Sequence, residues 1–237
     1  MNRLGSFKIE NVIEDNLFFS EYQPIVSANL NNIFAYEAFI RTTSNVKPNE
    51  LFESARDKGI LYEVDIAAIL NAIKEFPKTL FKDYFLFVNI FPSTLTNPKF
   101  CDFIELVIAY YPEIKNRIIL EINESSLEKN YWFDENLAAS ILHLELLGFK
   151  IAIDDIVLSK FWLEIIAVFN PHFVKIDKSY SQNLSEKSEE ITFLLTVIDK
   201  RVNLVLEGIE KEEDFVLAKQ LGVPLMQGYY FSKPLRL

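Results

Sequence analysis

Carboxylates and other polar residues stand where short apolar runs of this sequence stop. Glu121 follows the run 118–120, and the pair Asp154-Asp155 follows the run 151–153. Short apolar runs rich in β-branched residues are typical of buried strands. The same position is occupied elsewhere by Glu37, Asn89, Lys175, Glu207 and Gln227. If the strands lie side by side and point the same way, their polar ends meet at one mouth, where they can do chemistry together.

The candidate metal ligands offer only oxygen atoms. They come from four strand ends: Glu37, Asn89, Glu121, Asp154 and Asp155. Hard oxygen donors suit Mg²⁺ or Mn²⁺, and acids crowded at one mouth repel one another unless a cation or a proton neutralises them. Because Asp154 and Asp155 are neighbours, they can diverge toward two ions. We therefore expect one or two divalent cations, although any one of these acids alone is more simply a polar residue where a strand surfaces.

Three other strand-end residues suit the handling of a water or a ligand. Glu207 is a candidate general base, since a carboxylate beside a reacting water can take its proton. Lys175 would place a positive charge among the acids and could orient a water or a phosphate. A strand lysine that pairs with Asp177 is the simpler alternative. Gln227 could hydrogen-bond a ligand or a water.

Composition argues against several other kinds of site. The chain of 237 residues has one cysteine, Cys101, and two histidines, so we expect neither an internal disulfide nor a zinc site built from thiolates or imidazoles. The net charge of −10 argues against binding to long nucleic acid, which needs clustered Lys and Arg. The sequence shows neither an apolar run of membrane-spanning length nor a secretion signal, so we expect a cytoplasmic protein without membrane insertion.

Strand and helix patterns alternate along most of the chain. The predicted strands are 19–26, 33–40, 85–90, 117–122, 149–155, 173–177, 202–207 and 223–229, and the predicted helices are 48–58, 61–76, 98–110, 134–147, 160–169, 185–199 and 211–221. Strict alternation implies parallel strands with right-handed crossovers. Only residues 27–32 separate the first two strands, which is too short for a parallel crossover, so one strand must run in the opposite direction.

These patterns predict an α/β fold, a TIM-like (β/α)8 barrel with one antiparallel strand. An open doubly wound sheet is the alternative. It normally carries a Gly-rich phosphate loop after its first strand, and the six glycines of this chain are not arranged that way. Because no linker is evident, we expect a single barrel domain over residues 19–237, preceded by an arm or short helix at residues 1–18.

Several motifs in the same order resemble those of the EAL-domain family, bacterial phosphodiesterases of the second messenger cyclic di-GMP. The segments that carry the likeness are Tyr22-Gln23-Pro24-Ile25-Val26, Tyr36-Glu37-Ala38-Phe39-Ile40-Arg41, Val88-Asn89-Ile90, Leu120-Glu121-Ile122-Asn123-Glu124-Ser125, Ala152-Ile153-Asp154-Asp155, Val174-Lys175-Ile176-Asp177, Leu206-Glu207-Gly208-Ile209-Glu210 and the run 227–235. The likeness extends from about residue 19 to residue 235. Phe39 stands where the family usually has leucine.

The resemblance implies a role for each matching residue. It implies that metal is held by Glu37, Asn89, Glu121 and Asp154, with Asp155 serving a second ion. It also implies that water is positioned and activated by Lys175, Glu207 and Gln227, and that substrate is bound by Arg41 and Gln23. Glu124 matches the anchor of the loop after the two aspartates. The implied reaction is hydrolysis of one phosphodiester of cyclic di-GMP, with Mg²⁺ or Mn²⁺, to linear pGpG, by a protein that we expect to be a homodimer.

The loop after Asp155 departs from the family pattern. The family usually has Phe-Gly-(Thr or Ala)-Gly-Tyr-Ser-Ser at this place, whereas the chain reads Ile156-Val157-Leu158-Ser159-Lys160-Phe161-Trp162. Glycine adopts positive φ angles that the β-branched Val157 avoids, so this loop cannot copy the family's backbone. The departure leaves three alternatives open: reduced activity, a non-catalytic receptor of cyclic di-GMP, or a protein-interaction domain. A different metal-dependent phosphodiesterase on the same barrel is a weaker option.

Overall fold

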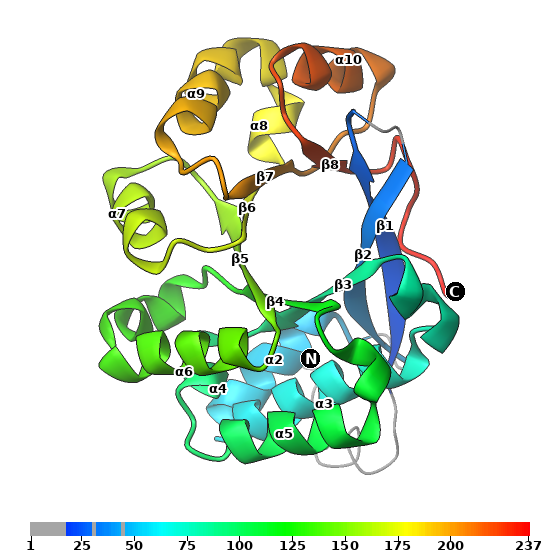
Figure 1. Cartoon of the computed structure of the whole chain (residues 1–237), viewed down its shortest axis with the longest axis vertical. Coiled ribbons are helices and arrows are strands. Elements are labelled where there is room, and N and C mark those ends of the chain that lie inside the picture. Colours follow the sequence, from blue (N-terminus) through cyan, green and yellow to red (C-terminus); the bar gives the residue numbers. More distant parts are fainter. Residues whose placement is uncertain (1–17, 30–31, 44–45) are drawn as a thin grey trace, which may run out of the picture.

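Eight strands close into a barrel, and helices pack around its outside (Figure 1). The structure is a computed structural model that describes residues 18–29, 32–43 and 46–237. In chain order the strands are β1 (Phe18–Ser27), β2 (Asn32–Thr42), β3 (Phe85–Ile90), β4 (Ile118–Ile122), β5 (Lys150–Ile156), β6 (Phe173–Ile176), β7 (Asn203–Leu206) and β8 (Leu225–Gln227). All of the predicted strands are present, with ends that differ by a few residues.

One strand runs against the others. β1 pairs antiparallel with both β2 and β8, whereas β2 to β8 pair in parallel with their neighbours. The pairing of β1 with β8 closes the barrel and excludes the open sheet. The structure therefore confirms the predicted fold class, with its reversed strand in the hairpin that the short connection required.

The helices lie where the apolar periodicity predicted them. They are α2 (Pro48–Asp57), α3 (Leu61–Glu75), α5 (Phe100–Tyr110), α6 (Glu135–Leu146), α7 (Lys160–Phe169), α9 (Leu184–Val197) and α10 (Glu212–Gln220). The sequence patterns did not predict the short helices α4 (Pro92–Leu95) and α8 (Ser179–Gln182), nor the 3-10 helices η2 (Lys78–Lys82), η3 (Pro112–Ile114) and η4 (Ser126–Phe133). One or two turns show too little periodicity to be recognised. No described helix is long and apolar enough to cross a membrane.

Inside the barrel, each strand contributes one side chain to a single apolar layer. This layer consists of Ile25, Ala35, Phe87, Ile119, Ala152, Phe173, Val205 and Leu225, all of them buried. A larger apolar cluster fills the space between the barrel and the surrounding helices. Because side chains alternate between the two faces of a strand, residues two positions away from this layer must also point into the barrel.

A partly buried ion pair ties the loops after β3 and β4 to α2. Glu128 in η4 has a fully buried side chain that pairs with Arg56 of α2. Glu128 also accepts hydrogen bonds from the backbone N–H (2.7 Å) and the hydroxyl (2.8 Å) of Ser93 in α4. Next to it, Asp65 of α3 accepts a hydrogen bond from the N–H of Phe91 (3.0 Å). Since α4 follows β3 and η4 follows β4, these contacts fix the backbone just beyond two strand ends.

We expect Arg56→Met to lower the free energy of unfolding by about 3–5 kcal/mol, because it leaves the buried Glu128 carboxylate without its cation. Methionine keeps much of the packing of the arginine stem, so the decrease in the free energy of unfolding measures the effect of the lost charge. Urea unfolding at neutral pH measures the effect. The control is Lys78→Met, which breaks the pair with Glu113 (2.8 Å), where Lys78 is 69% exposed and water screens the interaction. Equal losses in the two variants would contradict this account.

The arm or short helix expected at residues 1–18 lies outside the described residues except for Phe18, which begins β1. The other end of the chain returns to the barrel. Tyr22 and Leu235 exchange two backbone hydrogen bonds, of 2.7 and 3.0 Å, beside β1. The carboxyl-terminal segment thus packs against the reversed strand (Figure 1).

Candidate active site at the mouth of the barrel

A polar layer lies directly above the apolar layer inside the barrel. Each member follows a member of the apolar layer by two residues: Glu37 follows Ala35, Asn89 follows Phe87, Glu121 follows Ile119, Asp154 follows Ala152, Lys175 follows Phe173, Glu207 follows Val205 and Gln227 follows Leu225. Gln23 instead precedes Ile25 by two residues, because β1 runs the opposite way. Gln23 lies opposite Glu37 in the register. Side-chain alternation therefore brings the predicted strand-end residues to one mouth.

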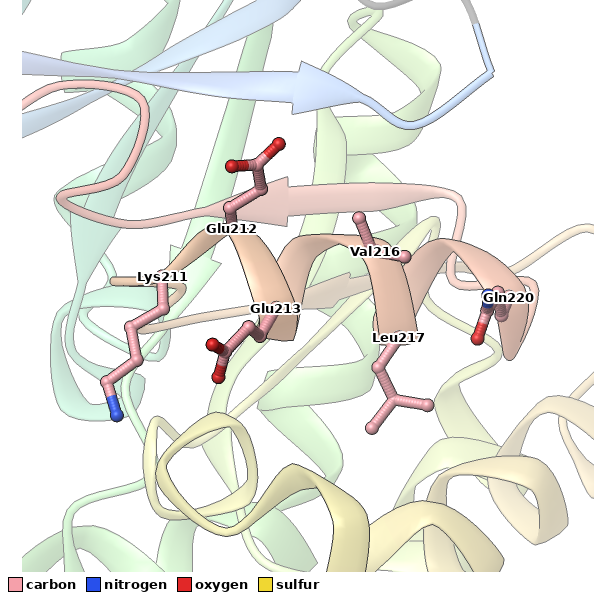
Figure 2. A pocket seen from close by; sticks show the side chains of 6 residues that line it. All are labelled: Lys211, Glu212, Glu213, Val216, Leu217 and Gln220. Atoms are coloured by element: carbon pink, nitrogen blue, oxygen red, sulfur yellow. The ribbon is translucent and has the colours of Figure 1, made fainter.

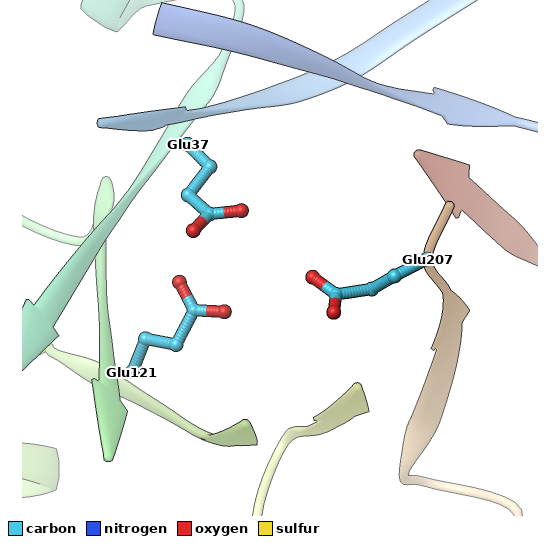
Figure 3. Close-up of side chains that lie close together, drawn as sticks. All are labelled: Glu37, Glu121 and Glu207. Atoms are coloured by element: carbon cyan, nitrogen blue, oxygen red, sulfur yellow. The ribbon is translucent and has the colours of Figure 1, made fainter. Parts of the chain in front are cut away.

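The carboxylates of this layer converge closely enough to share a cation. Figure 3 shows Glu37, Glu121 and Glu207 pointing toward one another, and one oxygen of each lies within 4.8 Å of the others. Asp154, Asp155 and Glu207 form a second group within the same limit. Glu207 belongs to both groups. Two adjacent groups of acids match the expectation that the site takes one or two ions.

Lys175 places its ammonium at the centre of these acids. Its side chain is 1% exposed, and Nζ lies 2.9 Å from Glu37, 2.5 Å from Glu207 and 3.1 Å from Asp154. It also pairs with Glu121. Burial disfavours the charged lysine, but the surrounding acids outweigh burial and raise the pKa of Lys175 well above its usual value. The lysine therefore remains protonated, and one ammonium faces several carboxylates.

Asp177 does not provide the pairing that was the simpler alternative for Lys175. Its carboxylate accepts a hydrogen bond from the backbone N–H of Ser179 (2.9 Å), at the start of α8. Lys175 and Asp177 are two residues apart, so in a regular strand they would share a face, but β6 ends at Ile176. The chain turns there, so Lys175 points into the barrel, whereas Asp177 lines the cleft and forms no ion pair with the lysine among the described residues.

One ammonium cannot neutralise the whole acid cluster. Among the described residues, Oε1 of Glu121 and Oδ1 of Asp154 share the Lys175 ammonium with Glu37 and Glu207, and Oε2 of Glu121 is buried and accepts no hydrogen bond. Glu37, by contrast, accepts hydrogen bonds from Lys175 (2.9 Å), Gln227 (2.8 Å) and Asn89 (3.3 Å). Buried anionic oxygens without donors are costly unless a cation coordinates them. These residues, which offer only oxygen, therefore fit a divalent cation such as Mg²⁺ or Mn²⁺.

Burial raises the pKa values of the three glutamates in this layer. It is the largest cause for Glu37, Glu121 and Glu207, and the charge of Asp154 adds to the increase in all three. The positive charge of Lys175 opposes these increases without cancelling them. Raised pKa values mean that the cluster holds protons in the absence of a cation. A divalent cation would compete with those protons, so its binding should tighten as the pH rises.

A bulge in β5 explains how two adjacent aspartates can both face the site. Ile153 pairs with Val174, but Ile156 pairs with Ile176, so β5 contains one residue more than β6 between these pairs. Asp155 adopts a left-handed backbone conformation, with φ of 49°. Aspartate tolerates this conformation better than most residues, and bulges redirect side chains. Without the bulge, Asp154 and Asp155 would point to opposite faces of the strand.

A cleft of about 1170 Å³ opens above the polar layer. Arg41 lies on its wall and forms an ion pair with Glu21 (2.8 Å), apart from the acid cluster. Gln23 lies deeper and donates a hydrogen bond to the carbonyl of Ser232 (2.8 Å). Glu124 also lines the cleft, but no hydrogen bond joins it to the loop after Asp155 among the described residues. The anchoring role of Glu124 thus stays a prediction.

A second hollow, of about 500 Å³, lies over the outer face of α10 (Figure 2). It is lined by Lys211, Glu212, Glu213, Val216, Leu217 and Gln220. These residues come from one helix and the residue before it, and they include none of the strand-end residues. The chemistry therefore belongs to the cleft at the barrel mouth.

Sequence reasoning missed the polar groups that hold the loops around this cleft. Glu128 lies in the polar stretch 128–130, which is typical of exposed loops, yet its side chain is fully buried. Asp65 carried a usable signal, because it stands on the apolar face of α3 between Val64 and Ile69. Burial raises the pKa of Asp65 to about 7. An acid on an apolar helix face indicates a buried hydrogen-bonding partner, which here is the N–H of Phe91.

Comparisons of the sequence with family models and with curated proteins point to the same family. The family model described as "EAL domain" matches residues 8–234. The probable cyclic di-GMP phosphodiesterase PdeI of Escherichia coli (strain K12) is 26% identical over 238 residues, which cover 96% of this chain and 30% of PdeI. The chain spans about a third of the length of the first curated relatives that it matches.

Solved structures share the fold. The FimX EAL domain from Pseudomonas aeruginosa, bound to c-di-GMP, matches with a TM-score of 0.85 and 22% identity over 97% of this chain and 95% of that chain. A manganese and cy-diGMP complex of Klebsiella pneumoniae BlrP1 matches with a TM-score of 0.81 and 22% identity over 92% of this chain and 56% of that chain. Because the family model covers nearly the whole sequence, this chain belongs to the EAL domain family.

Proposed function

We propose that this chain hydrolyses one phosphodiester of cyclic di-GMP to give linear pGpG, with Mg²⁺ or Mn²⁺ as cofactor. The observation that carries the proposal is the complete polar layer at the barrel mouth, in which several buried acids share one Lys175 ammonium and Oε2 of Glu121 accepts no hydrogen bond among the described residues. Such a layer costs stability and suits a cation-dependent reaction. The similarity to PdeI, a probable cyclic di-GMP phosphodiesterase, and to EAL structures bound to cyclic di-GMP supports cyclic di-GMP as the substrate.

In this proposal the acids of the polar layer hold the cofactor. Glu37, Asn89, Glu121 and Asp154 would hold one ion, and Asp155 would serve a second. When bound, the divalent cation would supply Lewis-acid stabilisation of the charge that develops on the phosphoryl oxygens. Side chains in the polar layer are fixed by strands rather than loops, so little reorganisation is needed when substrate binds.

Glu207, Lys175 and Gln227 would prepare the water that attacks phosphorus. Glu207 takes a proton from the water, and the Lys175 ammonium, 2.5 Å from the Glu207 carboxylate, holds that carboxylate in place. Gln227 bridges Glu37 (2.8 Å) and Gln23 (3.1 Å) through its amide nitrogen. The new bond joins the water oxygen to phosphorus. The bond from phosphorus to the ribose 3′ oxygen breaks, and that oxygen takes up a proton.

Arg41 and Gln23 would bind the substrate around the reacting phosphate. The Arg41 guanidinium lies on the cleft wall, where it can contact a phosphate while it keeps its pairing with Glu21. Gln23 lies opposite Glu37 across the β1–β2 pair and borders the acid layer. A nucleotide in a cleft of about 1170 Å³ would thus meet a cationic wall above an acidic floor.

The test is to incubate the purified protein with cyclic di-GMP and Mg²⁺ or Mn²⁺, and to separate the products by chromatography. We expect pGpG with either cation and none in EDTA. Intact cyclic di-GMP after incubation with enzyme in excess would contradict the proposal. Calorimetry then separates the alternatives, because nucleotide binding without product identifies a receptor, whereas no binding leaves a protein-interaction domain.

We also propose a homodimer, a cytoplasmic location, and one folding unit over residues 19–237. Large apolar side chains are exposed on α5 and α6, where Tyr110 is 77% and Leu146 is 79% exposed, which supports a contact between copies. Sedimentation equilibrium of the purified chain should give the mass of a dimer, and a monomer at micromolar concentration would contradict this part of the proposal. Cell fractionation and limited proteolysis test the location and the single unit.

A further inference from the structure

The phenol of Tyr180 holds the divergent loop that follows Asp155. Its oxygen accepts a hydrogen bond from the backbone N–H of Leu158 (3.0 Å) and donates one to the carboxylate of Glu190 (2.8 Å). The ring is buried, with 1% of the residue exposed. Residues 157–159 connect β5 to α7, so Tyr180 of α8 fixes the middle of this connection.

The hydroxyl of Tyr180 is oriented by the groups beyond it. Glu190 accepts a hydrogen bond from Lys187 (2.6 Å), and the Lys187 ammonium lies 5.2 Å from the centre of the Tyr180 ring. Hydrogen bonds from Lys187 and Tyr180 lower the pKa of Glu190, and burial raises the pKa of Tyr180 to about 12. At neutral pH the phenol therefore keeps its only proton and donates it in a hydrogen bond to the carboxylate. The phenol oxygen is left to accept the Leu158 N–H.

This contact lies three residues beyond Asp155. The Asp155 backbone is left-handed, a conformation that a non-glycine residue keeps only when the surrounding chain holds it there. On one side β5 holds it. On the other side the carbonyl of Ile156 accepts a hydrogen bond from the N–H of Asp177 (3.2 Å), and the Leu158 N–H meets Tyr180. The loop, which lacks the family's glycines, is thus held by a hydrogen bond to Tyr180.

We propose that Tyr180 is a positioning residue that, through the Leu158 N–H, keeps Asp155 directed toward the group formed by Asp154, Asp155 and Glu207. The inference rests on the proposed function, because it assigns this group to a divalent cation. Groups that orient metal ligands from outside the ligand shell typically contribute 10- to 100-fold to metal affinity. Tyr180 meets that description, since it accepts a hydrogen bond from the backbone of the loop that follows Asp155 and binds none of the acids in the group.

The test is Tyr180→Phe, which removes one oxygen atom and keeps the buried ring. We expect Mn²⁺ binding, measured by calorimetry, to weaken by about 10-fold, and the amides of residues 156–159 to exchange hydrogen faster. Turnover should recover when Mn²⁺ is raised to saturation. The matched control is Tyr22→Phe, which removes another buried hydroxyl, bonded to the carbonyl of Ala72 (2.8 Å), and should leave Mn²⁺ binding unchanged.

A second variant, Glu190→Ala, removes the acceptor that orients the phenol and should weaken Mn²⁺ binding in the same direction. If Tyr180→Phe binds Mn²⁺ as tightly as the wild-type protein does, the positioning role is overturned while the proposed function stands. Equal weakening in Tyr180→Phe and Tyr22→Phe would mean a general loss of rigidity, which also overturns it. A wild-type protein that binds no Mn²⁺ would instead overturn the proposed function, and this inference with it.

Discussion

Glu207→Gln should lower kcat for cyclic di-GMP by about 100- to 10,000-fold, even at saturating Mn²⁺. Glutamine keeps the size of the side chain but cannot take the proton of the attacking water. Among the glutamates of the polar layer, Glu207 is best placed for this role. Its side chain is 17% exposed at the mouth, whereas those of Glu37 and Glu121 are 3% and 0% exposed. A substrate that enters the cleft reaches Glu207 first.

The role of Glu207 as a base can be separated from a role as a metal ligand. Glu207 belongs to both groups of acids, so its substitution should also weaken cation binding. A loss of affinity is corrected by more Mn²⁺, whereas a lost base is not. The control is Glu210→Gln, which removes the same charge from an exposed position on the same cleft and should leave kcat close to that of the wild-type protein. If Glu207→Gln kept more than a tenth of kcat at saturating Mn²⁺, the assignment would be wrong.

Glu121→Gln should stabilise the metal-free protein and abolish its response to Mn²⁺. The Glu121 carboxylate is fully buried, it shares the single Lys175 ammonium with the other acids of the layer, and its Oε2 accepts no hydrogen bond among the described residues. Replacing such a buried carboxylate by a neutral amide should raise the free energy of unfolding by about 1–3 kcal/mol. Each kcal/mol raises the unfolding midpoint of a protein this size by about 2–4 °C. Mn²⁺ should raise the midpoint of the wild-type protein only, because a cation that binds the folded state stabilises it.

The increase in the free energy of unfolding caused by Glu121→Gln should grow as the pH rises. Burial, followed by the charges of Asp154 and Glu37, raises the pKa of Glu121 well above its value of about 4.3 in an unfolded chain. Above about pH 4, the folded protein therefore keeps a proton that the unfolded chain releases, and the free energy of unfolding falls as the pH rises. Glutamine has no such proton. Calorimetric scans in EDTA between pH 5 and pH 9 should show a smaller fall in the variant.

Glu37→Gln provides the matched comparison. Glu37 lies in the same layer, but its carboxylate accepts three hydrogen bonds, from Lys175, Gln227 and Asn89. A glutamine there turns an acceptor into a donor that faces other donors, which should cost about 1–3 kcal/mol. The two substitutions should thus shift the unfolding midpoint in EDTA in opposite directions. A shift in the same direction would contradict the view that the Glu121 carboxylate has fewer partners than the Glu37 carboxylate.

The sequence alone predicts much of this site because the barrel repeats one rule around its circumference. A residue two positions along a strand from an inward apolar residue also points inward, so Glu37, Asn89 and Glu121 could be placed together without coordinates. The reversed strand was predictable from the short connection at residues 27–32. For the same reason Gln23, on that strand, belongs to the mouth although it precedes its apolar neighbour.

Contacts between distant segments could not be predicted in this way. The Arg56–Glu128 pair joins positions 72 residues apart, and the Tyr180–Leu158 contact joins positions 22 residues apart. Neither contact produces a periodic pattern or a characteristic spacing in the sequence. The β5 bulge was equally hidden, because the conformation of Asp155 depends on a register shift against β6. The family resemblance drew attention to the loop after Asp155, but the substitute anchor became visible only in the folded structure.

The most direct measurement is hydrolysis of cyclic di-GMP in water enriched in oxygen-18, with enzyme in excess and Mn²⁺ present. If Glu207 activates a water that attacks phosphorus, mass spectrometry should find pGpG with one oxygen-18 atom in its terminal phosphate. The product should be absent in EDTA and should form far more slowly with Glu207→Gln. Intact cyclic di-GMP, or pGpG without the label, would contradict the account.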